Sequence, residues 1–117
     1  MFVEKPFYRK EMKMKIAVAT TDGLTVNEHF GRAKKFFIYE ATATTFNLLK
    51  ERNVEPYATA QKDHAFDKVR FQDVARVLED CEKVFITKIG DEPAGALEAL
   101  GIEPVVYSGA IKDIDLS

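Results

Sequence analysis

The chain has 117 residues, 46% hydrophobic and 31% charged, which is the composition of one globular domain large enough to bury a single core. The formal net charge of −2 is too small for the broad positive surface by which proteins bind nucleic acid. No apolar run approaches the roughly 20 residues that cross a bilayer, and a single cysteine excludes an internal disulfide and paired-cysteine metal motifs. Charged residues interrupt any signal-peptide core near the start, so we expect a cytoplasmic protein.

The first half of the chain is predicted to contain three strands. Residues 1–13 show no clear period and are interpreted as an N-terminal extension, whereas residues 14–117 form a single domain. Apolar runs predict strands at Lys15–Ala19, Lys35–Ala41 and Thr45–Arg52. The first run is apolar almost throughout, as is typical of a strand covered on both faces. The second and third runs are separated by three residues, which favours a hairpin.

A polar stretch at 53–67 is predicted to be the longest loop. The stretch Lys68–Glu82 then carries apolar residues at helical spacing, and Cys81 extends the same face. A strand is predicted at Lys83–Thr87, and the last strand at Glu103–Tyr107.

A short helix is predicted between these last two strands. Pro93 suits its first position, and Gly101 is typical of the residue just past a helix end. Ala94, Leu97 and Leu100 are predicted to line its buried face.

The order strand, strand, strand, helix, strand, helix, strand predicts an α/β fold. Hairpins in the first half favour antiparallel strands, and the strand–helix–strand units favour parallel ones through right-handed crossovers. We therefore expect a mixed five-stranded sheet with helices packed on it. Its strand order resembles the ribonuclease H-like arrangement.

His29 is the first candidate for chemistry, in a loop at 26–32 between the first two predicted strands. A neutral imidazole is a good ligand for zinc, iron or copper. Gly31 would let the backbone turn or approach a ligand closely. The alternative is a loop histidine that only caps a strand end.

Two further residues are candidate metal ligands. His64 lies in the polar loop, where a solvated side chain is the alternative. Cys81 lies on the apolar face of the predicted helix, where the alternative is an inert core thiol. The sequence does not show whether either residue lies near His29.

Evidence for an enzyme is poor. A ribonuclease H-type nuclease needs clustered carboxylates on its strands to hold magnesium, but the first strand has none and Asp22 lies beyond its end. The turn at Gly90 could offer backbone N–H groups to an anion, but Asp91 and Glu92 would repel phosphate. We therefore expect a protein that is not an enzyme.

Four blocks of the chain resemble a known family. They are KIAVATTDGLTVNEHFGRAKKFFIYE at 15–40, LEDC at 78–81, VFITKIG at 84–90 and LEALGIEPV at 97–105. In these blocks the chain is similar to the dinitrogenase iron–molybdenum cofactor biosynthesis family, the nitrogenase accessory proteins that include NifX-like proteins and the C-terminal domain of NifB. The resemblance covers about residues 14–106, and the first block is the most specific.

The resemblance implies a ribonuclease H-like fold without nuclease activity. It further implies a carrier that binds iron–sulfur or iron–molybdenum cluster precursors and exchanges them with a donor or acceptor protein. His29 would be the chief metal ligand, with Cys81 and His64 as further ligands and Asn27, Phe30 and Gly31 as cofactor-binding neighbours. Such a cluster needs one imidazole or thiolate plus backbone N–H groups facing its sulfides. A metal-free interaction or regulatory module of the same fold is the alternative, and oligomeric state has no signal in the sequence.

Overall fold

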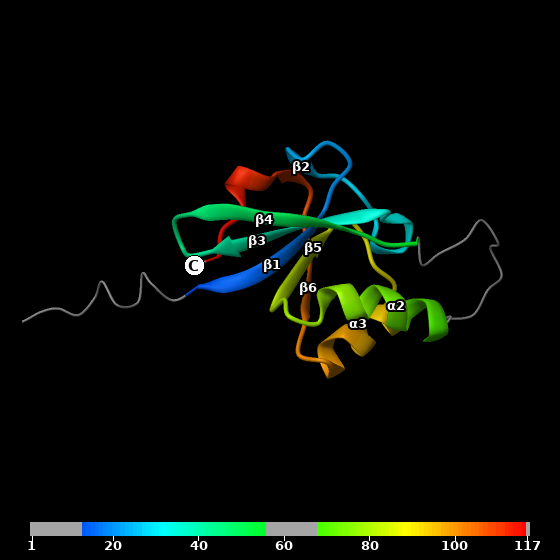
Figure 1. Ribbon diagram of the computed structural model, residues 1–117. Helices are drawn as coiled ribbons and strands as arrows, with labels where there is room; N and C mark the ends of the chain where they lie inside the picture. The colour runs from blue at the N-terminus through cyan, green and yellow to red at the C-terminus, as the bar shows by residue number, and fades with distance from the viewer. Residues whose placement is uncertain (1–12, 56–67, 117) are drawn as a thin grey trace, which may run out of the picture.

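Five strands form one mixed sheet in the spatial order β4-β3-β1-β5-β6 (Figure 1). The structure is a computed structural model that describes residues 13–55 and 68–116. The main strands are β1 (Met14–Ala19), β3 (Lys35–Ala41), β4 (Phe46–Asn53), β5 (Lys83–Ile86) and β6 (Glu103–Val106). Strand β3 is antiparallel to β1 and β4, while β5 is parallel to β1 and β6. The prediction of a mixed five-stranded α/β sheet is therefore confirmed, and each predicted strand agrees with its counterpart to within one residue at either end.

Two short strands are missing from the predicted order. These are the two-residue strands β2 (Thr25–Val26) and β7 (Gly109–Ala110), which pair with each other. Two residues carry no hydrophobic period, so the sequence pattern could not indicate them. The predicted extension at 1–13 lies outside the described residues except for Lys13, as do residues 56–67 of the predicted loop.

The helices α2 (Lys68–Leu78) and α3 (Asp91–Ala99) lie on one side of the sheet (Figure 1). On the other side lie β2, β7 and a short 3-10 helix, η2 (Ile111–Asp113). Two apolar layers fill these spaces, because alternate β1 residues point to opposite faces: Ala17 packs under the helices and Ile16 under the C-terminal segment. The prediction that β1 is covered on both faces is confirmed.

Helix α3 differs from its prediction at both ends. It begins at Asp91, so Pro93 is its third residue rather than its first. At the other end Leu100 is 59% exposed, whereas Ile102 is 1% exposed. Gly101 has a φ of +84°, and the Ile102 N–H then donates to the Leu97 carbonyl, so the chain turns back and buries Ile102 instead. None of the helices within residues 13–55 and 68–116 is both long and apolar enough to span a bilayer.

Arg52 ties the edge strand β4 to the end of α2, which stops at Leu78 and not at the predicted Glu82. Its Nη1 donates to the Val77 carbonyl at 2.6 Å and to Asp80 Oδ1 at 2.7 Å, and its Nη2 donates to Asp80 Oδ2 at 3.0 Å. These hydrogen bonds, aided by Lys15, hold the pKa of Asp80 well below its usual range. The guanidinium therefore satisfies a helix-end carbonyl and joins β4 to the sequence that precedes β5.

Replacing Arg52 by alanine is expected to lower the free energy of unfolding by about 1–2 kcal/mol, because a bidentate pair and a helix cap are lost at a partly solvated position. Urea denaturation measures this change. Arg76→Ala is the matched control, because its ion pair with Asp73 is exposed and is expected to contribute less than about 0.5 kcal/mol. Equal losses in both variants would contradict the assignment.

Candidate functional site

The loop that carries His29 follows a turn that begins at the carboxyl end of β1, and it reaches over the carboxyl end of β5. The Glu28 carbonyl accepts a hydrogen bond from the Thr87 N–H at 3.0 Å, and the Phe30 N–H donates to the Lys88 carbonyl at 2.9 Å. In open α/β sheets, ligands bind beyond the carboxyl ends of parallel strands. The His29 loop, residues 26–32, is therefore at the end of the sheet where a ligand site is expected.

The turn at 20–25 before this loop is held by its own side chains. Thr20 Oγ1 accepts hydrogen bonds from the N–H groups of Asp22 and Gly23. Asp22 Oδ1 in turn accepts from the N–H groups of Leu24 at 2.8 Å and Thr25 at 2.9 Å. These backbone hydrogen bonds, first that of Leu24, lower the pKa of Asp22 to about 2. The N–H groups of the turn are thus already engaged, which leaves them unsuited to cradle a phosphate or the sulfides of a cluster.

Asn27 joins the turn to the His29 loop. Its Oδ1 accepts from the Thr21 N–H at 2.9 Å, and its Nδ2 donates to Thr21 Oγ1 at 2.8 Å. Its own N–H donates to the Ala19 carbonyl at the end of β1. The sequence predicts Asn27 as a cofactor-binding residue, but both polar groups of its amide are used inside the protein. Asn27 therefore holds the turn and the loop together, and its role in cofactor binding stays a prediction.

His29 is half-buried and precedes the 3-10 helix η1 (Phe30–Arg32). Its N–H donates to Glu28 Oε1 at 2.9 Å, and its carbonyl accepts from the Arg32 N–H at 3.1 Å. The imidazole does not cap η1, and it makes no hydrogen bond or ion pair with any residue in 13–55 or 68–116. The backbone of His29 is thus fixed while its ring nitrogens stay available to a metal.

Phe30 anchors the loop. Its side chain is 1% exposed, and its ring centroid lies 6.3 Å from those of Phe36 and Phe71 in the helix-side core. A ring buried there holds His29 at the surface but cannot itself touch a surface-bound ligand. Gly31 lies within η1 and does not have a positive φ, so its backbone conformation is open to other residues.

Cys81 lies at the opposite end of the sheet from His29. It precedes the amino end of β5, and the next residue donates its N–H to the Lys15 carbonyl near the start of β1. A strand rises about 3.3 Å per residue, so the six residues of β1 separate the two ends by roughly 15–20 Å. Burial, aided by the charge of Asp80, raises the pKa of the thiol to about 12. Cys81 is therefore a protonated core thiol that is not part of the His29 site.

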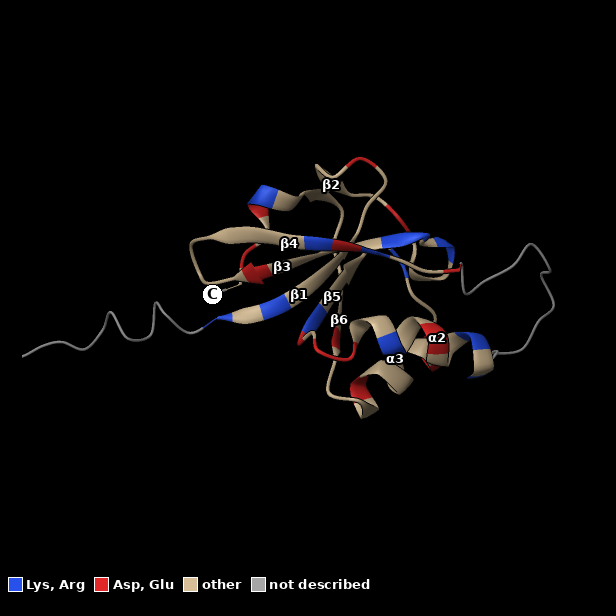
Figure 2. Cartoon of the chain, in the orientation of Figure 1, with Lys and Arg blue, Asp and Glu red and all other residues tan. Residues whose placement is uncertain are grey.

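The third predicted ligand, His64, lies outside the described residues. Within the described residues, no three or more His, Cys, Asp or Glu side chains come together where they could hold a metal ion. Figure 2 shows Lys and Arg interspersed with Asp and Glu along β4. The residues directly after the His29 loop include the basic residues Lys34 and Lys35.

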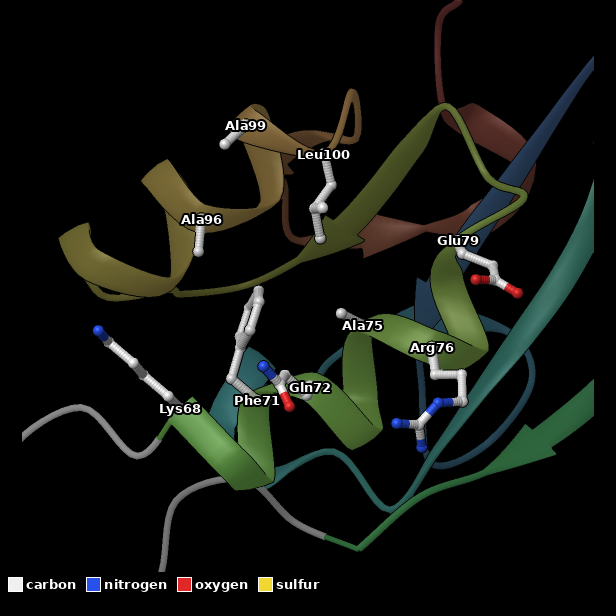
Figure 3. Close-up of a pocket in the computed structure, with 9 residues that line it drawn as sticks. All are labelled: Lys68, Phe71, Gln72, Ala75, Arg76, Glu79, Ala96, Ala99 and Leu100. Atoms are coloured by element: carbon white, nitrogen blue, oxygen red, sulfur yellow. The ribbon is translucent and has the colours of Figure 1, made fainter.

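A cavity of about 550 Å³ lies between α2 and α3. Figure 3 shows Phe71, Ala75, Ala96 and Leu100 around it, with charged side chains such as Arg76 toward its edge. Because this lining is mostly apolar and has no histidine or cysteine, the cavity lacks the ligands that a transition metal prefers. The His29 loop is the better candidate for metal chemistry.

These features define an α/β domain with one available imidazole on a fixed loop beyond parallel strands. The sequence pattern of the family described as dinitrogenase iron–molybdenum cofactor matches residues 12–115, and the chain belongs to this family. The resemblance found in the four sequence blocks is thereby confirmed.

The chain is similar to several curated proteins described as FeMo cofactor biosynthesis protein NifB. It is 41% identical over 90 residues to that of Frankia alni, which covers 77% of this chain and 18% of the relative. It is 36% identical over 89 residues to that of Azotobacter vinelandii, covering 76% and 18%. The chain thus spans about a fifth of the length of these relatives.

Two solved structures share the fold. The crystal structure of PH0822 matches with a TM-score of 0.63 at 21% identity, covering 86% of this chain and 84% of that one. The NMR structure of TM1290 from Thermotoga, assigned to the DUF35 family, matches with a TM-score of 0.51 at 20% identity, covering 85% and 80%. At these identities the likeness concerns the fold alone.

Proposed function

We propose that this chain is a non-catalytic carrier that binds iron–sulfur or iron–molybdenum cluster precursors in FeMo-cofactor biosynthesis, with His29 as the chief ligand. The observation that carries the proposal is an imidazole with no hydrogen-bonding partner among the described residues, on a loop whose backbone is fixed from both sides. Family membership and similarity to NifB proteins support the biosynthetic context. A donor or acceptor protein for the cluster is the partner that this role requires.

We further propose that the fold is of the ribonuclease H-like type. The order β4-β3-β1-β5-β6, with only β3 antiparallel to the other strands, supports this assignment. Strand β1 reads MKIAVA and has no carboxylate for magnesium. This absence supports the non-catalytic part of the proposal.

A single imidazole ligand suits a cluster that is bound only transiently. A cluster that arrives with its other iron positions occupied by its own ligands needs only one exchangeable bond from the protein. His29 supplies that bond, while Asn27 and Phe30 hold the loop. Cys81 is outside the proposed ligand set, because its thiol is buried, protonated and at the other end of the sheet. His64 is kept as a second candidate ligand on the strength of its side-chain chemistry alone.

The test is an anaerobic titration of the protein with a preformed, thiolate-ligated [4Fe–4S] cluster and with isolated iron–molybdenum cofactor, followed by visible absorption. His29→Ala is expected to weaken binding at least about tenfold, because the only assigned protein–metal bond is removed. Glu98→Ala, at an exposed position on α3, is the control, and His64→Ala tests the second histidine. Equal binding by wild type and His29→Ala would remove His29 from the site. No binding by the wild type would overturn the carrier proposal and favour a metal-free interaction module.

A further inference from the structure

The segment that follows β6 contains β7, which pairs with β2 just before the His29 loop. Strand β7 pairs with β2, with Ala110 opposite Thr25 and Gly109 opposite Val26. The Ile111 N–H adds a hydrogen bond of 2.9 Å to the Leu24 carbonyl. This contact lies on the side of the sheet away from α2 and α3 (Figure 1). Residues more than 80 positions apart in sequence therefore help to set the course of the chain into the His29 loop.

Tyr107 holds this segment in place. Its N–H donates to the Ile86 carbonyl at 2.9 Å, and its ring packs edge-to-face on Phe85 at 6.4 Å. Its hydroxyl donates to the Ala110 carbonyl at 2.7 Å, which closes the turn into β7. Gly109 within this turn has a φ of +146°, and a Cβ there would lie 3.2 Å from the Tyr107 hydroxyl. The close approach of Tyr107 over the turn therefore depends on glycine at that position.

The carboxyl end of β5 forms hydrogen bonds both with Tyr107 and with the His29 loop. Tyr107 is bonded to Ile86, and the next residue, Thr87, donates its N–H to the Glu28 carbonyl. Asn27 lies between the β2–β7 pairing, which ends at the buried Val26, and this hydrogen bond at Glu28. The position of His29 is thus fixed by β5 from one side and, through β7 and β2, by Tyr107 from the other.

We propose that Tyr107 is a positioning residue for His29, because its hydroxyl holds β7 against β2 and so fixes the loop in its ligand-binding form. This inference rests on the proposed carrier function. Loss of the hydroxyl removes one hydrogen bond but keeps the ring on Phe85. The pairing of β7 with β2 is therefore weakened while the core stays packed. A loosened loop must be ordered again when the cargo binds, which weakens binding.

The test compares Tyr107→Phe with Tyr39→Phe by titration with the thiolate-ligated [4Fe–4S] cluster, well below the unfolding temperature of every variant. Tyr39 is a matched control, because it is buried on the same side of the sheet, and no hydrogen bond of its hydroxyl to the described residues is present. Tyr107→Phe is expected to bind about three- to tenfold more weakly than wild type, and Tyr39→Phe within twofold. Hydrogen exchange at the amides of Val26 and Asn27 is expected to quicken in Tyr107→Phe alone, with no change in α2.

Gly109→Ala provides a second variant that perturbs the contact between Tyr107 and β7 while the hydroxyl is retained, because its Cβ would lie 3.2 Å from that hydroxyl. It is expected to weaken binding in the same direction. Wild-type affinity in Tyr107→Phe, or exchange that quickens equally throughout the sheet, would overturn the positioning role and leave the carrier function intact. Failure of the wild type to bind would overturn the carrier function, and the positioning role with it.

Discussion

Phe30→Ala is expected to lower the free energy of unfolding by about 3–5 kcal/mol, the largest loss among the substitutions considered for this chain. The ring is almost fully enclosed between Phe36 and Phe71, so its removal leaves a cavity in the helix-side core. Chemical denaturation followed by circular dichroism measures the change. Leu24→Ala is the matched control, because a side chain that is 72% exposed is expected to contribute within about 0.5 kcal/mol.

The same substitution is expected to affect the site, because Phe30 is the residue next to His29. Phe30→Leu retains most of the buried volume and is expected to lose only about 1–2 kcal/mol and to keep its cluster binding. If Phe30→Ala were destabilised by less than about 1 kcal/mol, the ring would not be the anchor of the loop.

Asp22→Ala is expected to disorder the turn at 20–25 and to weaken cluster binding about tenfold, because four hydrogen bonds from Leu24, Thr25 and the Thr20 hydroxyl lose their acceptor. Asp22→Asn retains one oxygen acceptor and is expected to fall between Asp22→Ala and wild type. Cluster titration with thermal unfolding measures both effects. Glu98→Ala, at an exposed position on α3, is the control and should bind as wild type.

The contribution of Asp22 has a defined pH dependence. The pKa of its carboxyl is lowered in the folded protein from the ordinary value of 3.8 to about 2. A group with a depressed folded-state pKa stabilises the fold above its unfolded-state pKa, and this contribution is lost as the pH falls through the folded-state value. The difference in melting temperature between wild type and Asp22→Ala is therefore expected to be constant from pH 7 to about 4 and to shrink from there toward pH 2. A difference that persists unchanged at pH 2 would rule out the carboxylate as its source.

The sheet could be predicted from the sequence because its strands are apolar runs with clear ends. The run at β1 needs cover on both faces, and the structure supplies it with helices on one side and the C-terminal segment on the other. The prediction that Leu100 is buried was wrong, and Ile102 is buried instead. Helical spacing takes no account of where the helix stops. Gly101, which has a positive φ, ends the helix and turns the chain so that Ile102 is buried. The position of this glycine in the sequence could have indicated that the following residue turns inward.

The candidate site was predicted only in part. The loop position of His29 follows from the order of strands, but the use of the Asn27 amide depends on Thr21, six residues away, and has no signature in spacing. The separation of Cys81 from His29 could have been predicted from the order of strands and helices. In a strand–helix–strand unit the residue before the second strand lies at its amino end, whereas a loop that follows a parallel strand lies at the carboxyl end.

The positioning contacts of the loop were missed for two different reasons. Thr20 and Asp22 form a local turn that their residue types favour, and the sequence Thr-Thr-Asp-Gly could have indicated it. Tyr107 acts across the sheet through a two-residue strand, and such long-range pairing is decided by packing of the whole domain rather than by local pattern.

The enclosure of Cys81 gives the chain a practical property for experiments on the proposed cluster transfer. Alkylating reagents attack thiolates, and a thiol that is 4% exposed with a pKa of about 12 presents almost none at neutral pH. Iodoacetamide can therefore block the accessible cysteines of a donor or acceptor in a mixed reaction while leaving Cys81 unmodified. The contribution of imidazole to each proposed transfer step could then be separated from that of the partner's thiols without a substitution in this chain.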